Sequence, residues 1–84
     1  MRYIARVEVK LKPGHSDPEG EITRDALREL KYPVESVRVS KVYEIVFEAE
    51  SIEDARAKVE EMCKRLLSNP VKDDYKYCIE ESLK

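Results

Sequence analysis

The chain has 84 residues, of which 42% are hydrophobic and 40% are charged, with a formal net charge of −2. This length fits a single domain over residues 1–84, and the hydrophobic share is too high for a disordered chain. The near balance of charge gives no reason to expect binding to nucleic acid or to an anionic membrane, and no run of about 18 apolar residues predicts a membrane span.

The cysteines and the N-terminus favour a cytoplasmic location. Two cysteines do not make a secreted disulfide scaffold, and the first residues carry no apolar signal stretch. The chain also has no Gln and one Asn among many Glu, Lys and Arg, which is a thermophile tendency. We therefore expect a melting midpoint above the range of about 45–65 °C that is common for mesophilic domains.

The first expected element is a strand over residues 2–12, where apolar and charged residues alternate with the period of two typical of a half-buried strand. Ile4 is the one apolar residue on the charged face. Pro13 and Gly14 then end the strand. The face expected to be buried carries Tyr3, Ala5, Val7, Val9 and Leu11.

A helix is expected from Pro18 to a point before Pro33, since a residue that precedes proline avoids helical geometry. Asp17 can cap this helix by accepting from its first free amides, and Pro18 suits the first helical position. Gly20 in the first turn costs about 1 kcal/mol of helix propensity. The apolar positions form one stripe: Ile22, Ala26, Leu27 and Leu30.

Residues 34–50 alternate again, which predicts either one long bent strand or two shorter strands. Lys41 interrupts the apolar parity, so a bend, bulge or turn is expected at Ser40 and Lys41. The second helix is expected after Ser51, which together with Asp54 resembles a capping box, and it should stop at Asn69-Pro70. The helix has a wide apolar stripe: Ile52, Ala55, Val59, Met62, Cys63, Leu66 and Leu67. A final strand is expected after it, with an apolar face made of Tyr75, Tyr77 and Ile79.

This order of elements predicts an α+β domain, a two-layer sandwich in which two helices cover one face of a mostly antiparallel sheet, βαβ(β)αβ, of ferredoxin-like character. The other face of the sheet mixes charges of both signs with a few apolar residues. That face fits a solvated surface, and equally a self-association surface with charge pairs around an apolar centre. Its apolar residues are Ile4, Val42, Val46 and Cys78.

Few side chains are suited to catalysis or metal binding. His15 is the only histidine, and although Ser16 and Asp17 follow it, consecutive residues do not give the geometry of a catalytic triad. Cys63 lies on the helical stripe, which predicts a buried, inert thiol, and one histidine cannot complete a typical zinc site. No catalytic or metal-binding residue is assigned, and the default function is an accessory subunit or a small-ligand regulatory domain.

Two parts of the chain resemble a known family. The run from Ala55 to Val71, followed by Asp74, Tyr75 and Tyr77, resembles PurS, the small-subunit family of phosphoribosylformylglycinamidine (FGAM) synthase. The N-terminal half agrees, with a Val-Glu-Val-Lys-Leu-Lys strand, the Asp-Pro-Glu-Gly motif that begins at Asp17, and a later Val-Arg-Val. The likeness covers about residues 2–81.

The resemblance implies a subunit, without an active site of its own, of an ATP- and glutamine-dependent C–N ligase in purine biosynthesis. PurS-like proteins are expected to form homodimers or larger homo-oligomers. They assemble with a synthetase subunit, PurL, and a glutaminase, PurQ, and the resemblance implies that they bridge these subunits and support ammonia transfer. The complex uses ATP, Mg²⁺ and glutamine, and the chain itself is expected to bind no cofactor.

The resemblance also implies interface residues in three motif segments: Asp17, Pro18 and Gly20; Arg38 and Lys41; and Asn69, Pro70, Asp74 and Tyr75. Arg38 and Lys41 are the best candidates, because neither cap nor core geometry demands a cation there. For the others, capping or core packing is an alternative explanation. A rival function is a small-ligand-sensing domain that acts as a dimer, although the sequence has no phosphate-binding loop.

Overall fold

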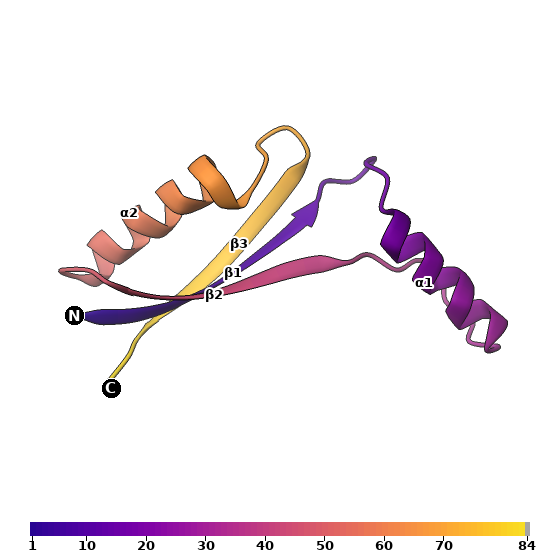
Figure 1. Ribbon diagram of the computed structural model, residues 1–84, viewed down its shortest axis with the longest axis horizontal. Helices are drawn as coiled ribbons and strands as arrows, with labels where there is room; N and C mark the ends of the chain where they lie inside the picture. The colour runs from indigo at the N-terminus through magenta and orange to yellow at the C-terminus, as the bar shows by residue number, and fades with distance from the viewer. Residues whose placement is uncertain (84) are drawn as a thin grey trace.

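Residues 1–83 of the computed structural model form three antiparallel strands and two α-helices (Figure 1). The strands lie in the order β2-β1-β3, so that the N-terminal strand is the central one. The predicted fold class and order of elements are confirmed. In chain order the elements are β1 (Arg2–Leu11), α1 (Pro18–Glu29), β2 (Ser40–Glu48), α2 (Ile52–Met62), a π-helical turn η1 (Cys63–Leu67) and β3 (Asp73–Glu81).

The core lies between α2 and one face of the sheet. The residues of β1 that alternate toward α2 are at most 6% exposed from Tyr3 to Val9, as the period-two pattern predicts. On the facing side of the helix, Ala55, Val59 and Cys63 are completely buried. Half-buried aromatic and aliphatic residues of the two outer strands complete the core: Tyr43, Ile45, Phe47, Tyr75, Tyr77 and Ile79.

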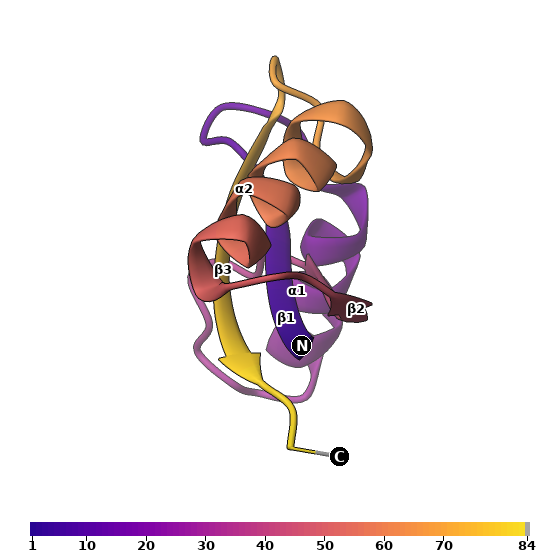
Figure 2. The ribbon, with the colours of Figure 1, turned by 90° about the vertical axis from the view of Figure 1, so that its left-hand side faces the viewer.

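The position of α1 corrects one part of the expectation, because this helix does not cover the sheet. It lies beyond the end of the strands (Figure 1), and in the view along the long axis α2 is in front and α1 at the rear (Figure 2). The radius of gyration is 16.5 Å, whereas a compact chain of this length has about 12 Å. We call residues 12–39 the arm, and residues 1–11 and 40–83 the body.

The segment that follows α1 explains this placement. Arg28 Nε donates to the Val34 carbonyl at 2.9 Å, and Arg28 Nη2 donates to the Glu35 carbonyl at 3.2 Å. At the other end of the helix, the Val37 carbonyl lies so close to Gly20 that a Cβ there would collide with it. Helix α1 is thus packed against residues 34–37, which follow it in the chain, and not against the sheet.

The outcome at residues 34–50 is a single strand, shorter than the alternation predicts. β2 begins at Ser40, and residues 34–39 belong to no helix or strand. Lys41 pairs with Val9 in the ladder, so its side chain is on the same face of the sheet as the core. The bend expected at Ser40 and Lys41 is the point where the chain passes from the arm to the body.

Candidate functional site

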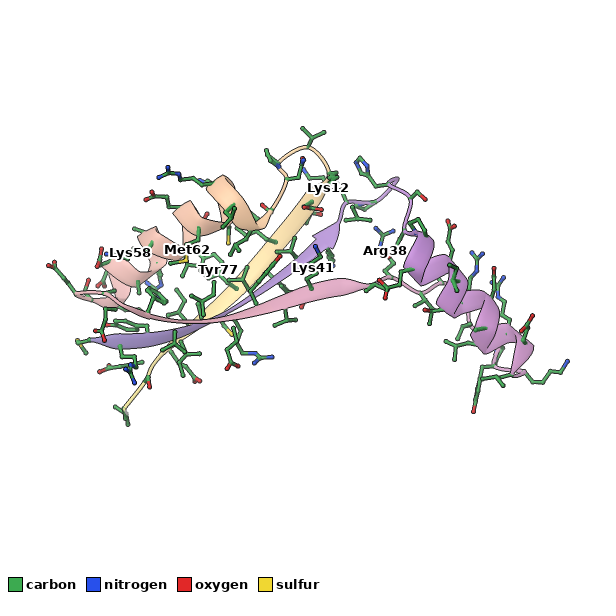
Figure 3. The ribbon with its side chains drawn as sticks, in the orientation of Figure 1. Lys12, Arg38, Lys41, Lys58, Met62 and Tyr77 are labelled. Atoms are coloured by element: carbon green, nitrogen blue, oxygen red, sulfur yellow. The ribbon has the colours of Figure 1, made fainter. Side chains whose placement is uncertain are left out.

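The three motif segments meet where the arm joins the body, a region we call the junction (residues 12–17, 37–41 and 69–74; Figure 3). The Lys12 amide donates to the Lys72 carbonyl at 2.7 Å, which ties the first segment to the third. The first and second segments are joined through Asp17, as described next. The structure therefore brings together residues that are far apart in the sequence.

Asp17 joins α1 to the start of β2. Its Oδ1 accepts from the Gly20 amide at 3.0 Å as the helix cap, and its Oδ2 accepts from the Val39 amide at 2.8 Å. The Val39 hydrogen bond, then the Gly20 hydrogen bond and the charge of Arg38, hold the pKa of the Asp17 carboxyl below its usual value. Pro18 occupies the first turn of the helix, as predicted. Asp17 and Gly20 thus have architectural roles, whatever they contact in an assembly.

Arg38 and Lys41 differ in what they contact, although they belong to the same motif segment. Arg38 Nη2 donates to the carbonyls of Leu11 at 2.9 Å and Lys12 at 3.3 Å, so the guanidinium hydrogen-bonds the backbone at the C-terminal end of β1. The Lys41 side chain is exposed and makes no hydrogen bond or ion pair to any residue of the described chain, 1–83. Lys41 is therefore the better contact candidate of the two (Figure 3).

The junction has two further lysines, Lys12 and Lys72, that form at most a weak ion pair with its acidic residues. Lys12 Nζ is 3.9 Å from Asp74 Oδ1, the limit of an ion pair, and both side chains are at least 40% exposed. Lys72 is exposed and, like Lys41, has no ion-pair partner within residues 1–83. Exposed pairs of this kind contribute little to folding. These lysines are free to bind an acidic surface.

The Asn69-Pro70 segment forms the turn that leads into β3. Asn69 Oδ1 accepts from the amides of Val71 and Lys72, at 2.9 and 3.3 Å, and the Asn69 amide donates to Asp73 Oδ2 at 2.9 Å. Pro70 is exposed. The local hydrogen bonds account for Asn69, so only Pro70 and the neighbouring charges remain available for contacts.

Tyr75 is part of a cluster inside the body. The Glu60 carboxylate accepts from the hydroxyls of Tyr75 at 2.7 Å and Tyr77 at 2.8 Å, and the two rings stack with centroids 6.5 Å apart. The hydrogen bond to Glu60 raises the pKa of Tyr75 to about 12, and the two hydroxyls lower the pKa of Glu60. Glu60 is not among the residues predicted for the site; in the sequence, its place beside Val59 of the apolar stripe is the hint that it faces β3.

The open face of the sheet carries the residues predicted for self-association. Val42 and Val46 are 54% and 55% exposed, Cys78 is exposed and Ile4 is half-buried. Charge pairs flank them: Arg6 Nη1 to Glu44 Oε2 at 2.7 Å, and Lys76 Nζ to Glu8 Oε2 at 3.7 Å. This face is apolar at its centre and has paired charges of both signs around it.

The groups considered for catalysis do not converge. Asp17 beside His15 is engaged by backbone amides, and Cys63 is buried in the core, where desolvation raises its pKa, as the predicted inert thiol requires. Within residues 1–83 no three His, Cys, Asp or Glu side chains lie close enough together to hold a metal ion. None of the helices in that range is long and apolar enough to cross a membrane.

A groove between α2 and β2 is a feature of the structure that was not predicted from the sequence. It encloses about 550 Å³, and its lining is mainly apolar. Leu66, at its edge, is 83% exposed. The signal was present in the sequence as the unusual width of the second helical stripe, which has more apolar positions than one sheet contact needs. Its lining residues are Ile45, Lys58, Glu61, Met62, Arg65, Leu66 and Leu67.

A mixed-charge junction, an open sheet face and an apolar groove, with no convergent reactive groups among residues 1–83, define a small α+β interaction module. The family model for PurS, phosphoribosylformylglycinamidine (FGAM) synthase, matches residues 4–81. The PurS subunit of Archaeoglobus fulgidus is 48% identical over 73 residues, which cover 86% of this chain and 91% of that protein. The chain belongs to the PurS family.

Solved structures agree with this assignment. Thermus thermophilus PurS superimposes with a TM-score of 0.88 at 42% identity, covering 98% of this chain and 99% of that one. A chain from the structure of PurLQS of Thermotoga maritima matches with a TM-score of 0.86 at 32% identity, over 95% of this chain and 99% of that one. The comparisons do not favour the small-ligand-sensing alternative.

Proposed function

We propose that this chain is a non-catalytic accessory subunit of an FGAM synthase complex in purine biosynthesis, where it bridges PurL and PurQ and supports ammonia transfer between them. One observation carries the proposal: the chain matches, over 95% of its length, a subunit seen in the structure of PurLQS. ATP, Mg²⁺ and glutamine are used by the other subunits of the complex. This chain supplies surfaces: Cys63 is buried in the core, the Asp17 carboxylate accepts from its own backbone amides, and no three metal-ligating side chains converge within residues 1–83.

Reconstitution tests this function. Cognate PurL and PurQ are mixed with and without the chain, and glutamine-dependent formation of FGAM is measured beside ammonia-dependent formation. We expect the glutamine-dependent reaction to require the chain and the ammonia-dependent reaction to require it much less, because only the former needs ammonia to pass between subunits. Equal rates with and without the chain, and no ternary complex in light scattering, would contradict the proposal.

Within that function, the junction is the surface that we assign to the partner subunits. Its exposed cations, Lys41 and Lys72, form no ion pair within residues 1–83 and fit an acidic patch on a partner. Pro18, Pro70 and Asp74 are exposed beside them, whereas Asp17, Gly20, Arg38 and Asn69 hold the junction in shape. Tyr75 supports the surface from inside the body.

The matched experiment uses charge reversal at two positions. Lys41→Glu with Lys72→Glu should lower complex formation at least tenfold without changing the melting midpoint of the free chain, since neither ammonium group has a partner to lose. Arg56→Glu on α2 with Lys64→Glu on η1 makes the same change in net charge and serves as the control. Arg38 is left unchanged because its replacement would remove the hydrogen bond to the Leu11 carbonyl at the end of β1. Equal binding by both double variants would exclude the junction.

The open face of the sheet is assigned to self-association with a second copy. Its charge pairs are Arg6 with Glu44 and Lys76 with Glu8. A two-fold axis through the apolar centre would place the positive groups of one copy opposite the negative groups of the other. Val46→Glu places a charge at that centre without touching the core. Light scattering should then show a smaller oligomer, and an unchanged mass would exclude this face.

A further inference from the structure

The junction contains a pocket on the face of the sheet that also carries α2. The pocket encloses about 290 Å³, just below the range of about 300–1,000 Å³ that is typical of small-ligand sites. Its walls come from the end of β1, the start of α1, the chain entering β2, η1 and the turn before β3. All three motif segments therefore contribute to it. A pocket of this size holds one or two side chains of another protein.

The floor of the pocket is apolar. Val9 and Leu11 lie on the face of β1 toward the core, and Leu67 is the last residue of η1. Val39, on the chain entering β2, is 37% exposed. The floor is uncovered because η1 ends at Leu67 while α1 lies beyond the end of the strands (Figure 1). An apolar side chain placed on this floor would be removed from water without any change in the fold.

Most of the acidic groups in the lining are already hydrogen-bonded. Both oxygens of the Asp17 carboxylate accept from backbone amides, at 2.8 and 3.0 Å. Asp73 Oδ2 accepts from the Asn69 amide at 2.9 Å. Glu19 is the one carboxylate of the lining that makes no hydrogen bond or ion pair within residues 1–83. The pocket thus offers a single free negative charge.

The lysines of the lining are free. The side chains of Lys41 and Lys72 are exposed and make no hydrogen bond or ion pair within residues 1–83. In Figure 3 Lys41 lies at the end of the sheet nearest the arm, in the same region as Lys12. Two free ammonium groups and one free carboxylate favour an occupant that brings a negative charge beside its apolar group.

We propose that the pocket holds an apolar side chain from a segment of PurL or PurQ, and that an Asp or Glu beside it in that segment pairs with Lys41 and Lys72. The inference rests on the proposed function and adds to it the kind of segment that the junction binds. The apolar side chain anchors the segment on Val39 and Leu67, since a buried anchor in a pocket carries much of the affinity of an interface. The lysines select an acidic segment over a basic one.

Photo-cross-linking identifies the occupant. Lys41 is replaced by a lysine analogue that carries a diazirine and keeps its ammonium group, and the complex with cognate PurL and PurQ is irradiated. Mass spectrometry should find a PurL or PurQ segment with an apolar residue and an Asp or Glu within two positions of it. The same analogue at Lys64, which is exposed and outside the pocket, is the control, and its yield on that segment should be at least tenfold lower. Cross-links from Lys41 to a second copy of this chain, or to a segment without an acidic residue, would overturn the proposal.

Filling the pocket gives a second readout. Val39→Trp keeps the backbone amide that donates to Asp17 and places an indole on the apolar floor. It should raise the dissociation constant for PurL and PurQ at least tenfold and leave the melting midpoint of the free chain unchanged. Ala57→Trp, at an exposed position of α2 outside the pocket, should bind like wild type. Lys41→Met with Lys72→Met should weaken binding and also reduce its dependence on salt, whereas Val39→Trp should keep that dependence.

The failure of this inference and the failure of the proposed function give different results. If the wild-type chain supports glutamine-dependent synthesis and Val39→Trp binds as tightly as wild type, the pocket is not the docking site and the accessory function stands. If Val39→Trp and Ala57→Trp weaken binding equally, the pocket is again excluded. If the wild-type chain neither binds PurL and PurQ nor supports synthesis, the proposed function fails and this inference fails with it.

Discussion

The two helices are alike in length and in capping and unlike in what they pack against. α1 has 12 residues and α2 has 11, and each begins with a side-chain cap, Asp17 and Ser51 respectively. Yet α2 buries Ala55 and Val59 completely, whereas Gly20 is the only buried residue of α1. Amphipathic spacing and caps therefore predict that a helix forms, but they do not say which surface covers it.

The connections on either side account for the difference. Residues 49–51 lead from β2 to α2, and the Ala49 amide donates to the Met1 carbonyl at 2.9 Å, which holds this turn against the start of β1. Residues 12–17 lead from β1 to α1, and Asp17 fixes the helix to the chain entering β2. Residues 49–51 therefore direct α2 back over the sheet, whereas residues 12–17 direct α1 away from it.

The largest expected effect comes from placing a charge where α2 meets the sheet. Val59→Asp puts a carboxylate at a completely buried position with no hydrogen-bond partner. It should cost about 4 kcal/mol or more, most of the stability of so small a domain. Urea unfolding followed by circular dichroism measures the loss.

Ala57→Asp is the control for that change. It adds the same charge to an exposed position of the same helix, two residues away. It should change the unfolding free energy by no more than about 0.5 kcal/mol. If both variants lost equal stability, helix propensity rather than burial on the sheet would stabilise α2, and the contrast between the helices would fail.

The sequence predicted what local spacing controls. Alternation located the buried face of β1 and placed Ile4, Val42 and Val46 on the open face, and the helical stripe placed Cys63 in the core. No local pattern indicates that Arg38 Nη2 donates to the Leu11 carbonyl, 27 residues earlier. That contact depends on where the arm turns back, which no local periodicity encodes.

Gly20→Ala tests how α1 is held, and a moderate effect is expected. At an ordinary helical position this change stabilises by about 1 kcal/mol. Here the new Cβ would collide with the Val37 carbonyl, so we expect a net loss of about 1–3 kcal/mol, typical of overpacking. Hydrogen exchange of α1 amides should report the loss. Thr23→Ala is the control: it is one turn further on and exposed, gains helix propensity without a collision with backbone, and should not lower the protection of α1 amides from hydrogen exchange. If Gly20→Ala stabilised the chain, α1 would not be packed against the Val37 carbonyl.

A smaller effect, dependent on pH, is expected in the body. The pKa of Tyr75 is raised to about 12 from an ordinary value of 10.0, so folding favours its protonated form. The stability that this contributes is complete below pH 10 and is lost as pH rises through about 12. Tyr75→Phe should therefore lower the urea midpoint at pH 8 and flatten its decline between pH 10 and 12. Tyr32→Phe, in the exposed part of the arm, should leave the midpoint and its decline unchanged.

The smallest effect is expected on the open face of the sheet. Arg6 pairs with Glu44 across β1 and β2 at 2.7 Å, but both side chains are more than half exposed. Arg6→Ala should cost the free chain about 0.2–1 kcal/mol, and less in 1 M salt, because water and ions screen exposed charges. In light scattering the same variant should weaken association through this face by a larger factor, since the pair loses water there. A large loss of monomer stability would mean that surface charge, and not the core under α2, holds the body together.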